Sequence, residues 1–223
     1  MRATLLLAGL LSLAPIPLRA QLRAERVNLE VRIDPAPLAV YAKARLVLRN
    51  RNPKSRDIVE LRFPAPLGSR VQVRAVWDRG GELGWRSDAG ADGESRKLRI
   101  ALRAPLRRGK KVEVVVSYDM DLTGFTSPEA PLEVSSSGAR LGTTGWYPLP
   151  LGLDPAAPQR LRLSVRLPKE WRVSARARLK KLSNGTALAS YELTLKRVEP
   201  GRWLLRAGTT LPGEALPSPA PRR

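Results

Sequence analysis

The chain contains neither histidine nor cysteine in its 223 residues. Histidine is the commonest general base and metal ligand near neutral pH. Its absence excludes histidine-centred catalytic triads and histidine-ligated zinc sites from this sequence. The absence of cysteine excludes disulfides, thiolate nucleophiles and cysteine-ligated iron–sulfur clusters. The sequence therefore predicts a protein that binds other molecules and is not an enzyme, with no metal and no cofactor.

The apolar stretch near the start of the chain is too short for a transmembrane helix, which needs about 20 apolar residues. It covers Leu5–Ala14, follows Arg2 and is succeeded by the small residue Ala20. A basic start, a short apolar core and a small residue are typical of a cleavable export signal. We therefore expect residues 1–20 to be a signal peptide and the mature protein to be periplasmic or secreted.

Acidic residues are scarce relative to basic ones: 20 against 40, for a net charge of +20. A protein with this excess of positive charge attracts polyanions. For an exported protein the expected partners are an acidic polymer or an anionic membrane surface, and not a specific nucleic acid. The alternative is that the basic residues only coat solvated faces, because they are spread along the chain and not gathered in blocks.

Apolar and polar residues alternate with a period of two along most of the chain, and no sustained helical stripe is present. Such alternation is typical of half-buried β-strands. The alternating segments are 27–33, 43–49, 71–77, 98–102, 112–118, 161–167, 171–179 and 191–195. They predict an all-β sandwich of mostly antiparallel strands over residues 21–210. Residues 124–145 are predicted to form a long loop, and the Pro-rich residues 211–223 a disordered tail.

Two groups of acidic residues are candidates for chemistry. Asp88, Asp92 and Glu94 lie in one turn, but their spacing departs from that of a calcium-binding loop. We therefore expect a solvated hairpin loop there. Asp119 and Asp121 lie two residues apart on one strand face, where paired acids can perform acid–base work. They carry the alternative hypothesis of a carboxylate-dependent hydrolase, against the simpler interpretation of structural acids at a strand end.

Basic residues alternate along two consecutive strand segments in the C-terminal half. They are Arg160, Arg162 and Arg166 on the first, and Arg172, Arg176, Arg178 and Lys180 on the second. Only a short turn separates the segments, so a hairpin would gather these side chains into one basic stripe. The stripe is a candidate site for phosphate or sulfate groups. It carries no aromatic stacking partners, which disfavours single-stranded nucleic acid; the alternative is a solvated face.

Several segments resemble the N-terminal domain of aminopeptidase N-like zinc metallopeptidases. The most specific is Gly145-Trp146-Tyr147-Pro148-Leu149, followed by Asp154-Pro155 and a strand that ends in Pro168. Further similar segments are the strands at 27–35 and 44–50, the Gly-then-Tyr step at 106–118, and the closing strand at 201–208. The resemblance implies a saddle-like β-sandwich that packs against a thermolysin-like catalytic domain, with Trp146, Tyr147 and Pro148 as a structural motif.

The departures from this family bear on function. The exopeptidase signature and the H-E-x-x-H motif have no counterpart, and the sequence ends where the catalytic domain would begin. In relatives, this domain also lends a Glu or Gln to the substrate's amino group, whereas residues 137–144 contain no acid or amide. We therefore expect a non-catalytic accessory module that docks on a separately encoded catalytic or envelope protein through an exposed apolar patch.

Overall fold

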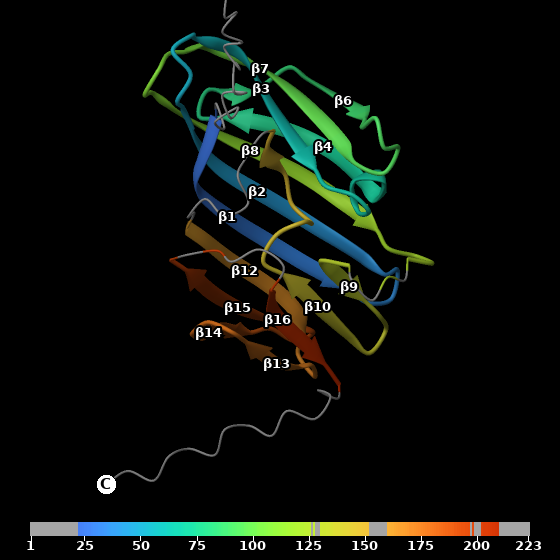
Figure 1. Cartoon of the computed structure of the whole chain (residues 1–223). Helices are drawn as coiled ribbons and strands as arrows, with labels where there is room; N and C mark the ends of the chain where they lie inside the picture. Colours follow the sequence, from blue (N-terminus) through green and yellow to red (C-terminus); the bar gives the residue numbers. More distant parts are fainter. Residues whose placement is uncertain are drawn as a thin grey trace, which may run out of the picture.

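The chain folds into three β-sheets, as shown in Figure 1 by a computed structural model that describes residues 22–125, 127, 130–151, 160–196, 198 and 202–209. The large sheet has the order β14 (Leu179–Asn184), β15 (Leu188–Leu195), β12 (Arg160–Pro168), β1 (Leu22–Asp34), β2 (Ala39–Asn50), β8 (Lys111–Asp121), β4 (Val71–Asp78) and β5 (Gly81–Glu82). The first small sheet has the order β13 (Arg172–Ala175), β16 (Trp203–Gly208), β10 (Gly138–Gly142) and β9 (Leu132–Val134). The second has the order β11 (Leu149–Pro150), β3 (Arg56–Phe63), β7 (Arg96–Leu106) and β6 (Trp85–Ala89).

The predicted all-β fold class is confirmed, since the regular elements of the described residues are all strands apart from the short 3₁₀ turn Gly68–Arg70. The strand pairs are antiparallel except β1 with β12, which run parallel with Val27 opposite Leu161 and Val31 opposite Val165. The expected signal peptide and Pro-rich tail lie outside the described residues, so both stay predictions.

One hydrophobic core joins the three sheets. Leu29 and Leu46 face inward from the large sheet, Leu61 from the second small sheet, and Leu141 and Leu205 from the first, and each is at most 1% exposed. Full burial of one such side chain contributes about 1.5–3 kcal/mol to the stability of the folded state. The small sheets therefore cover the inner face of the large sheet, while its outer face carries the polar half of each alternating strand.

The predicted loop at 124–145 is wrong in part, because β9 and β10 lie within it. Gly138 and Gly142 both lie in β10, where they pair with β16, and not in turns. A Cβ atom on Gly138 would lie 2.7 Å from the Ala207 carbonyl oxygen, and one on Gly142 would lie 2.8 Å from the Pro131 carbonyl oxygen. These glycines therefore permit close backbone approach between neighbouring segments.

The family-like motif is a buried structural element, with Trp146 at 1% and Tyr147 at 0% exposure and Pro148 also buried. The indole Nε1 of Trp146 donates a hydrogen bond to the Gly142 carbonyl at 2.7 Å. The Tyr147 hydroxyl donates to the Thr143 carbonyl at 2.7 Å. Each ring is thus hydrogen-bonded to the backbone four residues earlier, and these bonds fix the loop between β10 and β11.

We expect Tyr147→Phe to lower the free energy of unfolding by about 1–2 kcal/mol, because the Thr143 carbonyl loses its buried hydroxyl donor. Urea unfolding measures the change. Tyr41→Phe is the matched control, since the Tyr41 ring is 40% exposed. Equal effects of the two substitutions would contradict a structural role for the Tyr147 hydroxyl.

Asn50 is a fully buried polar residue that ties the large sheet to the second small sheet. Its Nδ2 donates to the Leu106 carbonyl at the end of β7, at 2.7 Å, and to the Lys54 carbonyl at 2.9 Å. Its Oδ1 accepts from the Asn52 amide at 2.9 Å. One amide side chain therefore satisfies three backbone groups where two sheets meet.

We expect Asn50→Leu to lower the free energy of unfolding by about 2–4 kcal/mol, because three backbone groups lose their partners in or near the core. Denaturant unfolding checks this value. Lys54→Ala keeps the Lys54 carbonyl and removes only an exposed side chain, so it should change stability by less than about 0.5 kcal/mol. A leucine variant as stable as the wild type would refute the bridging role.

Candidate functional site

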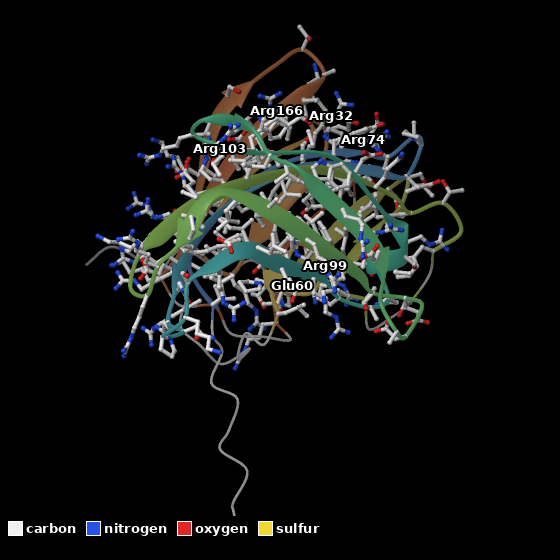
Figure 2. All side chains as sticks on the ribbon, turned by 90° about the horizontal axis from the view of Figure 1, so that it is seen from above. Arg32, Glu60, Arg74, Arg99, Arg103 and Arg166 are labelled. Atoms are coloured by element: carbon white, nitrogen blue, oxygen red, sulfur yellow. The ribbon has the colours of Figure 1, made fainter. Side chains whose placement is uncertain are left out.

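An open hollow of about 660 Å³ lies on the outer face of the large sheet, and we call it the central hollow. Outward side chains of β15, β12, β1, β2, β8 and β4 line it. The basic ones are Arg32, Lys43, Arg45, Arg74, Arg162 and Arg166, and the acidic ones are Glu30, Asp119 and Glu192. Figure 2 shows Arg32, Arg74 and Arg166 on one side of the molecule, with Arg99 and Glu60 on the opposite side.

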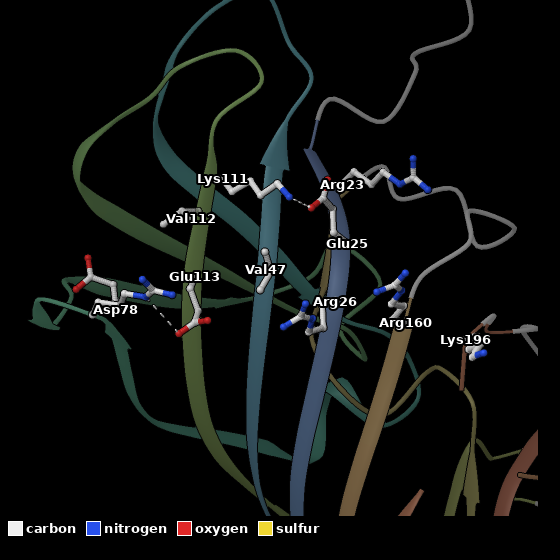
Figure 3. A pocket seen from close by; sticks show the side chains of 11 residues that line it. Arg23, Glu25, Arg26, Val47, Asp78, Lys111, Val112, Glu113, Arg160 and Lys196 are labelled. Atoms are coloured by element: carbon white, nitrogen blue, oxygen red, sulfur yellow. Dashed lines mark ion pairs between the residues drawn. The ribbon is translucent and has the colours of Figure 1, made fainter. Parts of the chain in front are cut away.

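A second hollow of about 900 Å³, the end hollow, continues the same face toward the start of β1 (Figure 3). Its basic residues are Arg23, Arg26, Arg79, Lys111, Arg160 and Lys196, and its acidic residues are Glu25, Asp78 and Glu113. Arg26 of the end hollow and Asn28 of the central hollow are two apart on β1, so they share one sheet face. We call the two hollows together the basic groove.

Ion pairs neutralise part of the charge in the basic groove. The Arg74 Nη2 atom lies 2.8 Å from the Asp119 Oδ2 atom, and the Arg74 Nε atom contacts the other oxygen. The Arg45 Nη1 atom lies 2.9 Å from the Glu113 Oε1 atom. Basic residues outnumber acidic ones two to one in each hollow, so the groove stays positive after these pairs form.

The structure divides the predicted basic stripe. Arg160, Arg162 and Arg166 are exposed on β12 as expected. The predicted hairpin is wrong, however, because β12 pairs with β1 and β15, whereas β13 pairs with β16 in a different sheet. The indole of Trp171, between β12 and β13, is 3% exposed and packs in the core, which directs the chain into the small sheet.

The second half of the stripe is spread over two sheets. Arg172 lies on β13, and Lys180 lies on β14 opposite Glu192 of β15. The Arg176 guanidinium lies 5.1 Å from the ring centroid of Trp203, and Arg178 is exposed between β13 and β14. Ligand binding by these residues stays a prediction, but the structure does not place them beside Arg160.

The paired acids on β8 have structural contacts. Asp119 and Asp121 do share the outer face, as predicted, and Asp119 is held by Arg74. Asp121 accepts a hydrogen bond from the Thr123 amide at 2.9 Å, which lowers the pKa of Asp121. A general acid needs a carboxyl pKa raised toward neutrality, so this arrangement gives no support to the hydrolase hypothesis.

The acidic turn is a hairpin between β6 and β7, as predicted. The Asp92 Oδ1 atom accepts hydrogen bonds from the hydroxyl and the amide of Ser95, at 2.7 and 2.8 Å, and these lower the pKa of Asp92. Arg62 pairs with Asp92 and Arg86 with Asp88. The carboxylates of Asp88 and Asp92 therefore contact protein donors and cations.

Within the described ranges, no group of three or more possible ligand side chains is placed to hold a metal ion. Over the same residues, no helix has both the length and the hydrophobicity needed to cross a bilayer.

Comparison with known proteins identifies the fold. No family model and no curated protein matches the sequence. Among solved structures, the M1 zinc metallopeptidase from Deinococcus radiodurans has a TM-score of 0.65 and 18% identity, over 85% of this chain and 43% of the metallopeptidase. A mutant of an M1 zinc metallopeptidase from the same organism, bound to a Tyr-Ser-Ala substrate, gives 0.64 and 18%, over 84% and 42%. Yeast LTA4 hydrolase in complex with bestatin gives 0.60 and 11%, over 84% and 29%.

The predicted resemblance is confirmed at the level of the fold. This chain has the β fold found in part of the M1 zinc metallopeptidases and spans less than half the length of those it matches. At these identities the likeness establishes architecture, so activity and partners have to be argued from this chain's own residues.

Glu25, which lines the end hollow, makes the stability of the fold depend on pH. The Lys111 Nζ atom lies 2.6 Å from its Oε2 atom, and Arg49 pairs with its other oxygen. The hydrogen bond from Lys111 is the main cause that lowers the Glu25 pKa below its ordinary 4.5. A carboxyl pKa that is lower in the folded state stabilises the fold above the unfolded pKa, and this stabilisation is lost as the pH falls through the folded pKa.

We expect Glu25→Gln to lower stability at neutral pH by less than about 1 kcal/mol, as for other exposed ion pairs. The difference from the wild type should fade as the pH falls below the folded pKa of Glu25. Thermal unfolding at a series of pH values measures both effects. Glu170→Gln, which alters an exposed acid outside the groove, is the control. A stability difference that is independent of pH would contradict the assignment.

Proposed function

We propose that residues 22–209 form a non-catalytic binding domain that docks on a zinc-peptidase catalytic unit. The observation that supports the proposal is the fold match, which covers 84% of this chain and only 42% of a matched metallopeptidase. The sequence has no histidine to build a histidine-ligated zinc site of its own. The acids proposed for an independent hydrolase are engaged by Arg74 and Thr123.

Among the described residues, the large hydrophobic side chains with the highest exposure are scattered and do not form one patch. The three large exposed hydrophobic side chains, Tyr41, Ile58 and Leu182, lie on β2, β3 and β14, and none of these strands pairs with another of the three. We therefore propose a docking surface that combines aromatic and polar side chains.

Trp203 is the best candidate for the centre of such a surface. It lies on β16 of the first small sheet, is only partly buried, and is flanked by the guanidinium groups of Arg176 at 5.1 Å and Arg206 at 4.6 Å. Tryptophan and arginine are the residues most enriched at interface hot spots. Stacking on the indole also holds both arginines in a fixed position for a partner.

We expect the purified chain to bind no stoichiometric zinc and to release no product from aminoacyl substrates. We also expect it to co-purify with a metallopeptidase from the native cells in a defined stoichiometry. Zinc analysis, a chromogenic aminopeptidase assay and quantitative mass spectrometry measure these outcomes. Turnover by pure, zinc-supplemented chain would overturn the proposal.

Trp203→Ser should reduce recovery of the metallopeptidase at least tenfold, because truncating a central interface tryptophan costs about 2 kcal/mol or more. Ile58→Ser is the matched control, since it removes a 49% exposed hydrophobic side chain from the other small sheet. Equal recovery with the wild type and both variants would exclude Trp203 as the docking centre.

A further inference from the structure

The parallel pairing of β1 with β12 places arginines beside arginines on the outer face. Arg32 is opposite Arg166, and six residues earlier Arg26 is opposite Arg160. All four side chains are exposed. Neighbouring strands are about 4.8 Å apart, so each pair holds two positive charges close together, an arrangement that destabilises a sheet.

The described residues offer these four arginines no ion-pair partner. Glu30 lies on β1 between the two pairs and forms an ion pair with neither of them in the structure, while Glu192 is taken by Arg162. The Arg32 guanidinium stacks on the ring of Tyr41 at 4.5 Å. Stacking orients Arg32 and leaves the edges of its guanidinium, which carry the hydrogen-bond donors, available to a ligand.

We infer that Arg32 and Arg166 form an anion site in the central hollow, that Arg26 and Arg160 form a second in the end hollow, and that the basic groove takes a linear polymer bearing phosphate or sulfate groups. Arg32 and Arg166 line the central hollow and lie on the same side of the molecule in Figure 2. Arg26 and Arg160 both line the end hollow (Figure 3). Guanidinium groups bind such oxyanions through paired N–H donors.

The arrangement and spacing of the pairs specify the ligand. The tetrahedral oxygens of a phosphate or sulfate group point in different directions, so one group can accept hydrogen bonds from two guanidinium groups at once, whereas the two oxygens of a carboxylate lie in one plane and match a single guanidinium fork. The pairs are six residues apart on β1, or about 20 Å at the usual strand rise. A hollowed sheet face accommodates an extended chain along this length, whereas a flat bilayer contacts only its rims.

The test compares the wild type with the double variant Arg32→Gln/Arg166→Gln. Its matched control is Arg86→Gln/Arg99→Gln, which removes another cross-strand arginine pair, from β6 and β7 of the second small sheet. Arg86 and Arg99 are paired with Asp88 and Glu60, and Arg99 lies on the side of the molecule away from Arg32 and Arg166 (Figure 2). Both variants lose the same formal charge.

Inorganic polyphosphate, heparin and polyglutamate are the probes, titrated at several salt concentrations. The wild type should bind polyphosphate or heparin, and the Arg32/Arg166 variant should bind at least tenfold more weakly, with the slope of log K against log salt reduced by about 1 to 2. The Arg86/Arg99 variant should change affinity by less than about threefold, the size of a long-range charge effect. The relative affinity for polyphosphate and heparin distinguishes a phosphate ligand from a sulfate ligand.

Three results would overturn the inference. Equal weakening by both double variants would show attraction by net charge alone. Polyglutamate binding as tightly as both other polymers would remove the preference for phosphate or sulfate. Binding to phosphatidylglycerol vesicles without binding to any polymer would assign the face to a membrane surface. Thermal unfolding guards against misfolding, and the Arg32/Arg166 variant should be no less stable than the wild type because it relieves repulsion.

Discussion

The parallel contact between β1 and β12 is the constraint on which the large sheet depends. On one side of it lie β2, β8, β4 and β5, and on the other lie β15 and β14. These two groups of strands meet in the sheet only through β1 and β12. A parallel pair cannot be closed by a tight turn, so this contact joins segments that are distant in the sequence. Its register, with Val27 opposite Leu161, aligns the buried faces of both groups over one core.

Alternation in the sequence was sufficient to predict the class of fold and several strands, because it reports which side chains are buried. The predicted segments 27–33, 43–49 and 112–118 all lie within observed strands. Alternation does not report which strand lies next to which. The predicted hairpin after Pro168 was wrong for this reason, since the burial of Trp171 sends the chain to another sheet. The predicted loop at 124–145 was wrong in part, because Gly138 and Gly142 permit close packing of backbone segments in a sheet.

The candidate site could likewise be predicted only in part. Arg160, Arg162 and Arg166 could be named from the sequence, because their alternation with apolar residues places them on an outer face. That Arg26 and Arg32 lie beside Arg160 and Arg166 could not be predicted, because a parallel register over such a distance in sequence has no local signal. The ion pair between Arg74 and Asp119 could not be predicted from the sequence either, because Arg74 lies at an irregularity in the pairing of β4 with β8.

The surfaces proposed for binding lie on different sheets, and this separation has a physical consequence. Trp203 projects from the first small sheet, whereas Arg32 and Arg166 project from the outer face of the large sheet, with the shared core between the two sheets. A ligand in the proposed groove would therefore not compete for space with a partner at Trp203. Close-packed cores resist deformation, so under the two proposals the domain would act as a rigid connector, with the polyanion on one face and the protein partner on another.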